Sequence, residues 1–214
     1  IQSIIEEFTS PAAVVINRHV RKINPMNSLV IAYHHNIGRE PQFNVGHHPE
    51  TYTFYRFCKD KGIKNIKFYA GFPKHSFNAI NEMIEWGFGG NELVKIGNVK
   101  IRPIDFLKER LKELKIPKGY KERENLWVEI DGKKNNKNKK ILMECIVPTL
   151  IGWKDAGCNI DTGMPASIIA QMIKRDIIGE AGSFAPENVV PVEPFFSEIA
   201  ARKMQVFENN RRIN

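Results

Sequence analysis

The sequence predicts an α+β fold in which helices pack on a mixed, largely antiparallel sheet. Two observations support this prediction: runs of β-branched and aromatic residues recur along the chain, and segments with apolar residues at helical three- and four-residue spacing separate them. A third observation concerns their order, because strands and helices do not alternate with the regularity of βαβ units. The pattern is therefore not that of a doubly wound parallel sheet.

The 214 residues are 42% hydrophobic and 26% charged, which is typical of a globular chain. We find no internal repeat and no dividing linker, so a single domain is expected over residues 1–214. The longest nearly apolar run, Ile141–Trp153, contains Glu144 and Pro148 and is shorter than the ~20 residues that span a bilayer. With no signal-peptide pattern and three scattered cysteines, we expect a cytoplasmic, non-membrane protein with reduced thiols. Because the first residue is Ile1 and not Met, we expect a fragment of a longer chain or a processed chain.

Four segments of the first seventy residues are predicted to be strands, because β-branched and aromatic residues favour a half-buried pleated surface. Between the second and third of them, residues 38–49 contain two Pro, two Gly and two His and are expected to form an irregular loop. The four predicted strands are Ala12–Ile16, Ser28–Tyr33, Thr51–Phe57 and Ile63–Tyr69.

Four helices follow from apolar residues that recur on one face. The first begins at Ser76 and ends at Gly87, and the second begins at Pro103 and ends before Pro117. The third opens at Thr162, and the last runs from near Pro194 to about Lys203. The predicted buried stripes are Phe77, Ile80 and Ile84; Ile104, Leu107, Leu111 and Leu114; and Ile168, Ile169, Met172 and Ile173.

Two hairpins are predicted between these helices. Leu93–Ile96 and Val99–Ile101 flank Gly97-Asn98, a two-residue turn signal. Leu126–Ile130 and Ile141–Val147 are joined by a Lys- and Asn-rich tip. The formal charge of the chain is +8, and Asp131–Lys140 alone holds five Lys and one Asp. Because no aromatic residue lies among these lysines, we expect a solvated tip and no nucleic-acid partner.

Common catalytic motifs are missing from the sequence: it has no dinucleotide fingerprint, phosphate-binding loop, nucleophile elbow or H-E-x-x-H. Histidines come in the pairs His34-His35 and His47-His48, and two of them with Glu50 are one possible metal site. Hydrogen bonding to a substrate or to the backbone is the favoured alternative. The start of the third helix, at Thr162-Gly163, offers free N–H groups that favour a carboxylate or phosphate.

The chain resembles the C-terminal domain of the saccharopine dehydrogenase family over nearly its whole length. Thr162-Gly-Met-Pro-Ala with a downstream Pro186-Glu187 is the most specific part of the resemblance. The other matching segments are Tyr69–Pro73, Phe77–Gly87, Val94–Pro103, Trp127–Gly132, Gly182–Glu187 and Pro194–Phe196, with looser matches at Glu6–Ala12, Ile37–Arg39 and His48–Glu50.

This resemblance implies an oxidoreductase that uses NAD or NADP and acts on the C–N bond of an amino acid or polyamine precursor, of the saccharopine, lysine or carboxynorspermidine type. In the family a Rossmann domain binds most of the cofactor, and the second domain supplies the substrate pocket and the contacts of a homodimer. The Rossmann domain is absent from this chain, so we expect the isolated fragment to be inactive.

The residues suggest roles that fit such an enzyme. Arg39 is the candidate for the substrate carboxylate, and His48 or Glu50 for the acceptor of the amine proton. Thr162 and Gly163 are further candidates for substrate binding. Met164 and Pro165 are assigned to the cofactor, and no metal is assigned. The alternative is a non-catalytic interaction domain of the same fold that binds an anionic partner through the Lys133–Lys140 tip.

Overall fold

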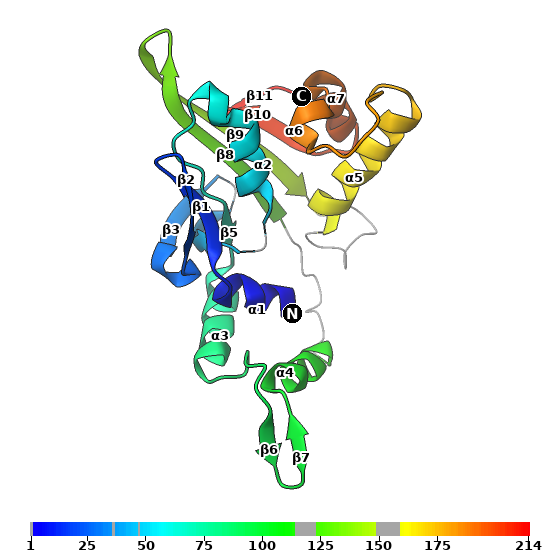
Figure 1. The fold of residues 1–214 in the computed structure, drawn as a ribbon. Helices are drawn as coiled ribbons and strands as arrows, with labels where there is room; N and C mark the ends of the chain where they lie inside the picture. Colours follow the sequence, from blue (N-terminus) through cyan, green and yellow to red (C-terminus); the bar gives the residue numbers. More distant parts are fainter. Residues whose placement is uncertain (1, 36, 47, 114–122, 149–158) are drawn as a thin grey trace. The chain divides into compact units, whose positions relative to one another are not determined.

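The structure, a computed structural model, describes residues 2–35, 37–46, 48–113, 123–148 and 159–214 (Figure 1). The chain divides into two compact units: the first unit holds residues 1–33 and 38–116, and the second holds residues 34–37 and 117–214. Helices are found in both units, and every strand pair whose register the structure gives is antiparallel. The predicted α+β class is confirmed, whereas the single domain over 1–214 stays a prediction.

Three sheets are described in the first unit. β1 (Ala12–Ile16) pairs with β2 (His19–Ile23) through a turn in which Asn17 and Arg18 both have positive φ, as a tight hairpin requires. The second sheet has the order β3-β4-β5, formed by Val30–His34, Gly38–Asn44 and Tyr69–Gly71. The third is the predicted hairpin of β6 (Val94–Ile96) and β7 (Val99–Ile101).

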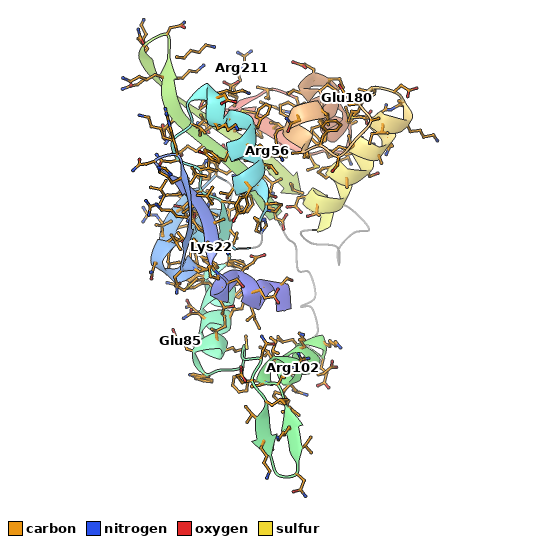
Figure 2. All side chains as sticks on the ribbon, viewed as in Figure 1. Lys22, Arg56, Glu85, Arg102, Glu180 and Arg211 are labelled. Carbon is orange, nitrogen blue, oxygen red and sulfur yellow. The ribbon has the colours of Figure 1, made fainter. Side chains whose placement is uncertain are left out.

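Four helices accompany these sheets: α1 (Gln2–Thr9), α2 (Glu50–Cys58), α3 (Lys74–Glu85) and α4 (Pro103–Lys112). Short 3₁₀ turns lie at Pro25–Ser28 and Lys59–Lys61. α1 contributes to two apolar clusters, because its Ile5 packs with Ile104 and Leu107 of α4 while its Phe8 packs with Phe43 of β4. At the start of α4, Arg102 (labelled in Figure 2) donates from Nε to Asp105 Oδ2 at 2.6 Å and holds the pKa of Asp105 below its ordinary value.

The helices predicted at Ser76 and Pro103 are confirmed, with Gly87 at φ 85° directly after the C-cap of α3. The predicted strand Thr51–Phe57 is wrong, because these residues form α2. Thr51 is buried, and Tyr55, one helical turn later, donates its hydroxyl to the carbonyl of Arg18 at 2.6 Å. The residues that contact the protein are therefore spaced four apart, as on one face of a helix, although the residue types alternate as in a strand.

Two further segments differ from prediction. Most of the expected loop 38–49 is the strand β4. Phe43, on this strand, and Val45, directly after its end, are almost fully buried. The strand expected at Ile63–Tyr69 is reduced to a single bridge between Ile66 and Val15, and regular pairing starts only at Tyr69 in β5. The predicted buried position Leu114 and the stop at Pro117 lie outside the described residues.

The second unit is a four-stranded antiparallel sheet with the order β11-β10-β9-β8. β8 (Arg123–Lys134) and β9 (Lys137–Pro148) form one long hairpin around Asn135-Asn136, both at positive φ, which confirms the predicted tip. β10 (Gln205–Glu208) pairs with β9, and β11 (Arg211–Arg212) with β10. Val147 of β9 and Val206 of β10 pack against the helices of this unit.

Three helices form the other layer of the second unit (Figure 1): α5 (Asn159–Lys174), α6 (Pro186–Val189) and α7 (Val192–Ala201). The last one matches the helix predicted near Pro194. On α5, Ile168 and Met172 are fully buried as predicted and Ile169 packs against the same core, whereas Ile173 is 53% exposed and was wrongly assigned to the buried stripe.

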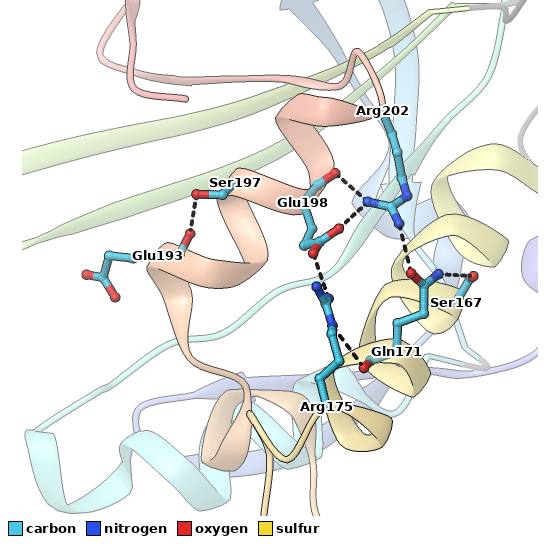
Figure 3. Close-up of polar contacts among 7 residues, drawn as sticks. All are labelled: Ser167, Gln171, Arg175, Glu193, Ser197, Glu198 and Arg202. Atoms are coloured by element: carbon cyan, nitrogen blue, oxygen red, sulfur yellow. Dashed lines mark hydrogen bonds and ion pairs between the residues drawn. The ribbon is translucent and has the colours of Figure 1, made fainter.

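A polar network joins α5 to α7 (Figure 3). The carboxylate of Glu198 accepts hydrogen bonds from Arg175 at 2.6 Å and from Arg202 at 2.5 Å. These two guanidinium groups, Arg202 first, hold the pKa of Glu198 below its ordinary value. Gln171 accepts a hydrogen bond from Arg175 through its backbone carbonyl and one from Arg202 through its side-chain oxygen. Its side-chain amide donates to the hydroxyl of Ser167 at 3.2 Å. Since all of these groups bond to one another, the network is a structural link.

Candidate functional site

The candidate site lies in the first unit, where a short loop connects β4 to α2. His48 is in this loop, and its ring lies between two carboxylates that come from different helices. Nε2 of His48 is 3.6 Å from Oε1 of Glu7 on α1, and Nδ1 is 3.5 Å from Oε2 of Glu50 at the start of α2. We call Glu7, His48 and Glu50 the His48 cluster.

The surroundings of His48 favour its protonated form. Its side chain is 31% exposed, and its ring stacks on Phe68 with the centroids 4.3 Å apart. The interaction with Glu7 is the main cause that raises the pKa of His48 above its ordinary value; Glu50 acts in the same direction and burial opposes both. An imidazole held between two carboxylates is oriented at both nitrogens, which suits it to give or take a proton.

The backbone around the His48 cluster is packed closely. A Cβ on Gly46 would stand 2.9 Å from the carbonyl oxygen of Ser10 and 3.1 Å from that of Pro11, directly after α1. Asn44, at the end of β4, is 1% exposed, and its backbone N–H donates to the hydroxyl of Ser28 at 2.8 Å. Glycine at 46 therefore lets the loop approach the end of the helix that carries Glu7.

The structure brings His48 and Glu50 together, as their spacing in the sequence predicted. Arg39 belongs to β4 of the same unit, where it is exposed and forms no ion pair with any described residue. Its guanidinium group is thus available to a carboxylate ligand. The sequence alone does not identify Glu7 as part of this cluster, because Glu7 lies on α1, 41 positions before His48, and no local pattern marks it.

The other predicted contact residues, Thr162–Pro165, belong to the second unit and lie inside α5. The prediction of a helix start at Thr162 is wrong: α5 begins at Asn159, because Ile160 packs in the core and extends the helix by a turn. Thr162 donates its hydroxyl to Asp161 at 3.2 Å instead of capping the helix. Pro165 has no N–H for the carbonyl of Asp161, so a helical hydrogen bond is missing at this turn.

A second polar cluster, also missed from the sequence, lies on the β8–β9 sheet. Glu144 is only 2% exposed and faces Trp127 across the strand pair. The Nδ2 of Asn125, at 2.8 Å, is its one hydrogen-bond donor among the described residues, and Oδ1 of Asn125 is buried without a donor. The ring of His34 meets Trp127 edge-on at 4.6 Å. The unsatisfied Oδ1 of Asn125, beside a buried carboxylate and an indole, favours a cationic group.

Other features of the described residues add little to the site. No three or more His, Cys, Asp or Glu side chains of the described part are placed to hold a metal ion, and His47 lies outside it. Cys58 and Cys145 are free thiols, and burial raises the pKa of Cys145 to about 11; Cys158 is outside the described part. Among the described helices, none has the length and apolar content needed to cross a membrane.

Comparison with known protein families matches most of the chain to a family model. The family model described as Saccharopine dehydrogenase C-terminal domain covers residues 1–204. The match includes the first unit, the second unit as far as residue 204, and all of the candidate residues named above; β10 and β11 lie beyond it.

Proposed function

Because the chain belongs to the saccharopine dehydrogenase C-terminal domain family, a family of oxidoreductases, we propose that it is the substrate-binding, catalytic and dimerisation domain of an NAD(P)-dependent enzyme. The proposed reaction takes place at the C–N bond of an amino acid or polyamine precursor, of the saccharopine, lysine or carboxynorspermidine type. The observation that carries this proposal is the His48 cluster, an oriented proton-transfer group.

Oxidation of a secondary amine to an imine releases a hydride and a proton. His48 accepts the proton, and Glu7 positions the ring and strengthens it as a base. Glu50, on the other ring nitrogen, is the second candidate for the same role. In the reverse direction the protonated imidazole returns the proton to the product nitrogen.

The hydride acceptor would be the nicotinamide cofactor, which a domain outside this chain holds for the most part. Gly163 suits a close approach, because among the described residues no atom beyond its chain neighbours and the backbone of α5 lies within 4 Å of the place where its Cβ would stand. The side chain of Met164 packs in part against the core of the second unit, so only its remaining exposed surface is proposed for a cofactor contact. Thr162 and Pro165, on the same turn, are the other proposed contacts.

One group is proposed to hold a charged end of the substrate. Arg39 binds a carboxylate, since its guanidinium has no partner among the described residues and a planar fork matches that group. Loss of this contact weakens ground state and transition state alike.

The test is steady-state kinetics of the protein with its nucleotide-binding domain, using candidate amino-acid substrates. His48→Gln is expected to lower kcat by about 10²-fold with little change in KM. Arg39→Ala is expected to raise KM by about ten-fold or more with a smaller change in kcat. In the oxidation direction, kcat/KM of the wild type should rise with pH through the raised pKa of His48, and Glu7→Gln should shift this rise to lower pH.

His75→Gln is the matched control, because His75 is an exposed residue of α3 outside the cluster. Its kinetics should match those of the wild type. If His48→Gln, Glu50→Gln and Arg39→Ala all kept wild-type kinetics, the catalytic assignment would be refuted and the Thr162–Pro165 turn would be tested next. A full-length protein without a nucleotide-binding domain would favour an interaction domain that binds an anionic partner through the β8–β9 tip.

A further inference from the structure

A buried carboxylate lies in the middle of the sheet of the second unit. The sheet order places β9 between β8 and β10, and Glu144 of β9 is almost fully buried. Among the described residues its hydrogen-bond donor is the neutral amide of Asn125, at 2.8 Å, and no described basic side chain forms an ion pair with it. A carboxylate taken out of water normally has a cation or several donors beside it.

The lysine and arginines on the same face of the sheet are distant from Glu144 or engaged elsewhere. Arg123 and Lys140 lie four positions along the strands from Glu144 and its partner on β8, about 13 Å at roughly 3.3 Å per residue. Lys140 also forms an ion pair with Glu129 at 2.8 Å. Arg212 is two strands away on β11, and its Nε donates to a backbone carbonyl two residues later at 2.6 Å. No cation of the described sheet therefore neutralises Glu144.

Two aromatic side chains flank Glu144 on this face. Trp127 of β8 and Phe207 of β10 both lie directly opposite Glu144 in the strand register. Residues directly opposite one another point to the same face with their Cβ atoms about 4.5–5.5 Å apart, so the side chain of Glu144 leaves the sheet between these two rings. The faces of such rings attract organic cations within about 6 Å of their centroids.

Asn125 adds a second acceptor to the same face. It lies two positions before Trp127, and its Oδ1 is buried without a donor. An ammonium group has three N–H donors, so it can serve Oδ1 of Asn125 and the carboxylate of Glu144 at once. Asn125, Trp127 and Phe207 are only partly buried, which allows an alkyl chain to extend from the ammonium group to solvent.

We propose that Glu144, Asn125, Trp127 and Phe207 form a binding site for an organic ammonium group carried on an alkyl chain. An ammonium group is favoured over a metal ion because one carboxylate meets two aromatic rings here, and no group of three His, Cys, Asp or Glu among the described residues is placed to hold a metal. Phe207 lies beyond residues 1–204, the part that the family model matches. The inference goes beyond the proposed function, because it depends on neither the cofactor nor turnover.

Fluorine NMR of the full-length protein labelled with 5-fluorotryptophan tests the proposal. The Trp127 signal is assigned from its loss in Trp127→Phe. n-Butylammonium should shift this signal saturably, whereas n-butanol, which has the same chain and no charge, should not. Glu144→Gln keeps the size of the side chain and removes its charge, and it should raise the dissociation constant of n-butylammonium by about ten-fold or more. Phe207→Leu should raise it by about three-fold.

Glu208→Gln is the matched control. Glu208 follows Phe207 on β10 and points to the opposite face of the sheet, so this variant should bind n-butylammonium like the wild type. Circular dichroism checks that each variant is folded, and Phe207→Leu, at a partly exposed position, provides the test if Glu144→Gln does not fold.

The absence of a saturable shift at about 100 mM n-butylammonium would overturn the proposal, since binding that weak is worth little more than 1 kcal/mol. An equal response to n-butanol, or unchanged binding in the folded Glu144→Gln or Phe207→Leu variant, would also overturn it. Tighter binding of n-butylguanidinium would refute the assignment to an ammonium group. None of these measurements needs turnover, so they stand apart from the tests of the catalytic assignment.

Discussion

Replacement of Gly46 by alanine should show how much the His48 cluster depends on the close approach between its loop and α1. The added Cβ would stand 2.9 Å and 3.1 Å from the carbonyl oxygens of Ser10 and Pro11, and both are backbone atoms that cannot rotate away. Overpacking of this kind costs about 1–3 kcal/mol. The lower entropy of the unfolded alanine chain returns about 0.5 kcal/mol. We therefore expect Gly46→Ala to lose about 0.5–2.5 kcal/mol of unfolding free energy.

Urea unfolding of wild type and variant, followed by circular dichroism, measures this difference. Gly71→Ala is the control, because the nearest atoms to its Cβ are at 3.9 Å and 4.0 Å and its backbone is extended. It should change the stability by less than about 0.5 kcal/mol. Since the strain also displaces the end of α1, the pKa of His48 measured by NMR should fall in Gly46→Ala. An unchanged stability together with an unchanged His48 titration would refute the reasoning.

Three further predictions concern stability. The folded pKa of His48 lies above its ordinary 6.5, so its stabilising contribution is full below pH 6.5 and is lost as pH rises through the folded pKa. In urea titrations the stability difference between wild type and His48→Gln should therefore shrink as pH rises above 6.5. Ile168→Ala should cost about 2–5 kcal/mol, whereas Ile173→Ala should cost less than about 0.5 kcal/mol; equal losses in thermal unfolding would contradict the assigned face of α5. Replacement of Lys133–Asn138 by Asn-Gly shortens only the exposed end of the β8–β9 hairpin, and a loss above about 1 kcal/mol would show that the tip packs.

Elements whose ends carry local signals were predictable from the sequence. Gly97-Asn98 and the Asn-rich tip mark hairpins, and Pro103 and Gly87 mark helix ends, since each acts on the backbone of its immediate neighbours. The strand β4 was hidden because Pro41 and polar residues interrupt its alternation, although Phe43 is fully buried. Pairing with β5, which is distant in sequence, determines its conformation.

The residues of the candidate site also divide into those that local sequence signals predict and those that distant contacts bring in. His48 and Glu50 lie two positions apart, so their proximity could be predicted, whereas Glu7 joins them only after α1 has packed. A signal for Glu144 was present, because a carboxylate stands in the apolar run of β9. Its partner Asn125 is set by the register of the hairpin, which the sequence leaves open over several residues.

The path of the chain affects how this protein can be divided for study. Residues 34–37 belong to the second unit, although the residues on both sides of them belong to the first. The backbone therefore passes between the units three times, after residues 33, 37 and 116. Proteolysis at a single bond does not release either unit as one piece. A recombinant fragment that ends at residue 116 would still carry His34 but would lose Trp127, the ring that His34 contacts. Excision of a unit requires a replacement for residues 34–37 that reconnects β3 to β4.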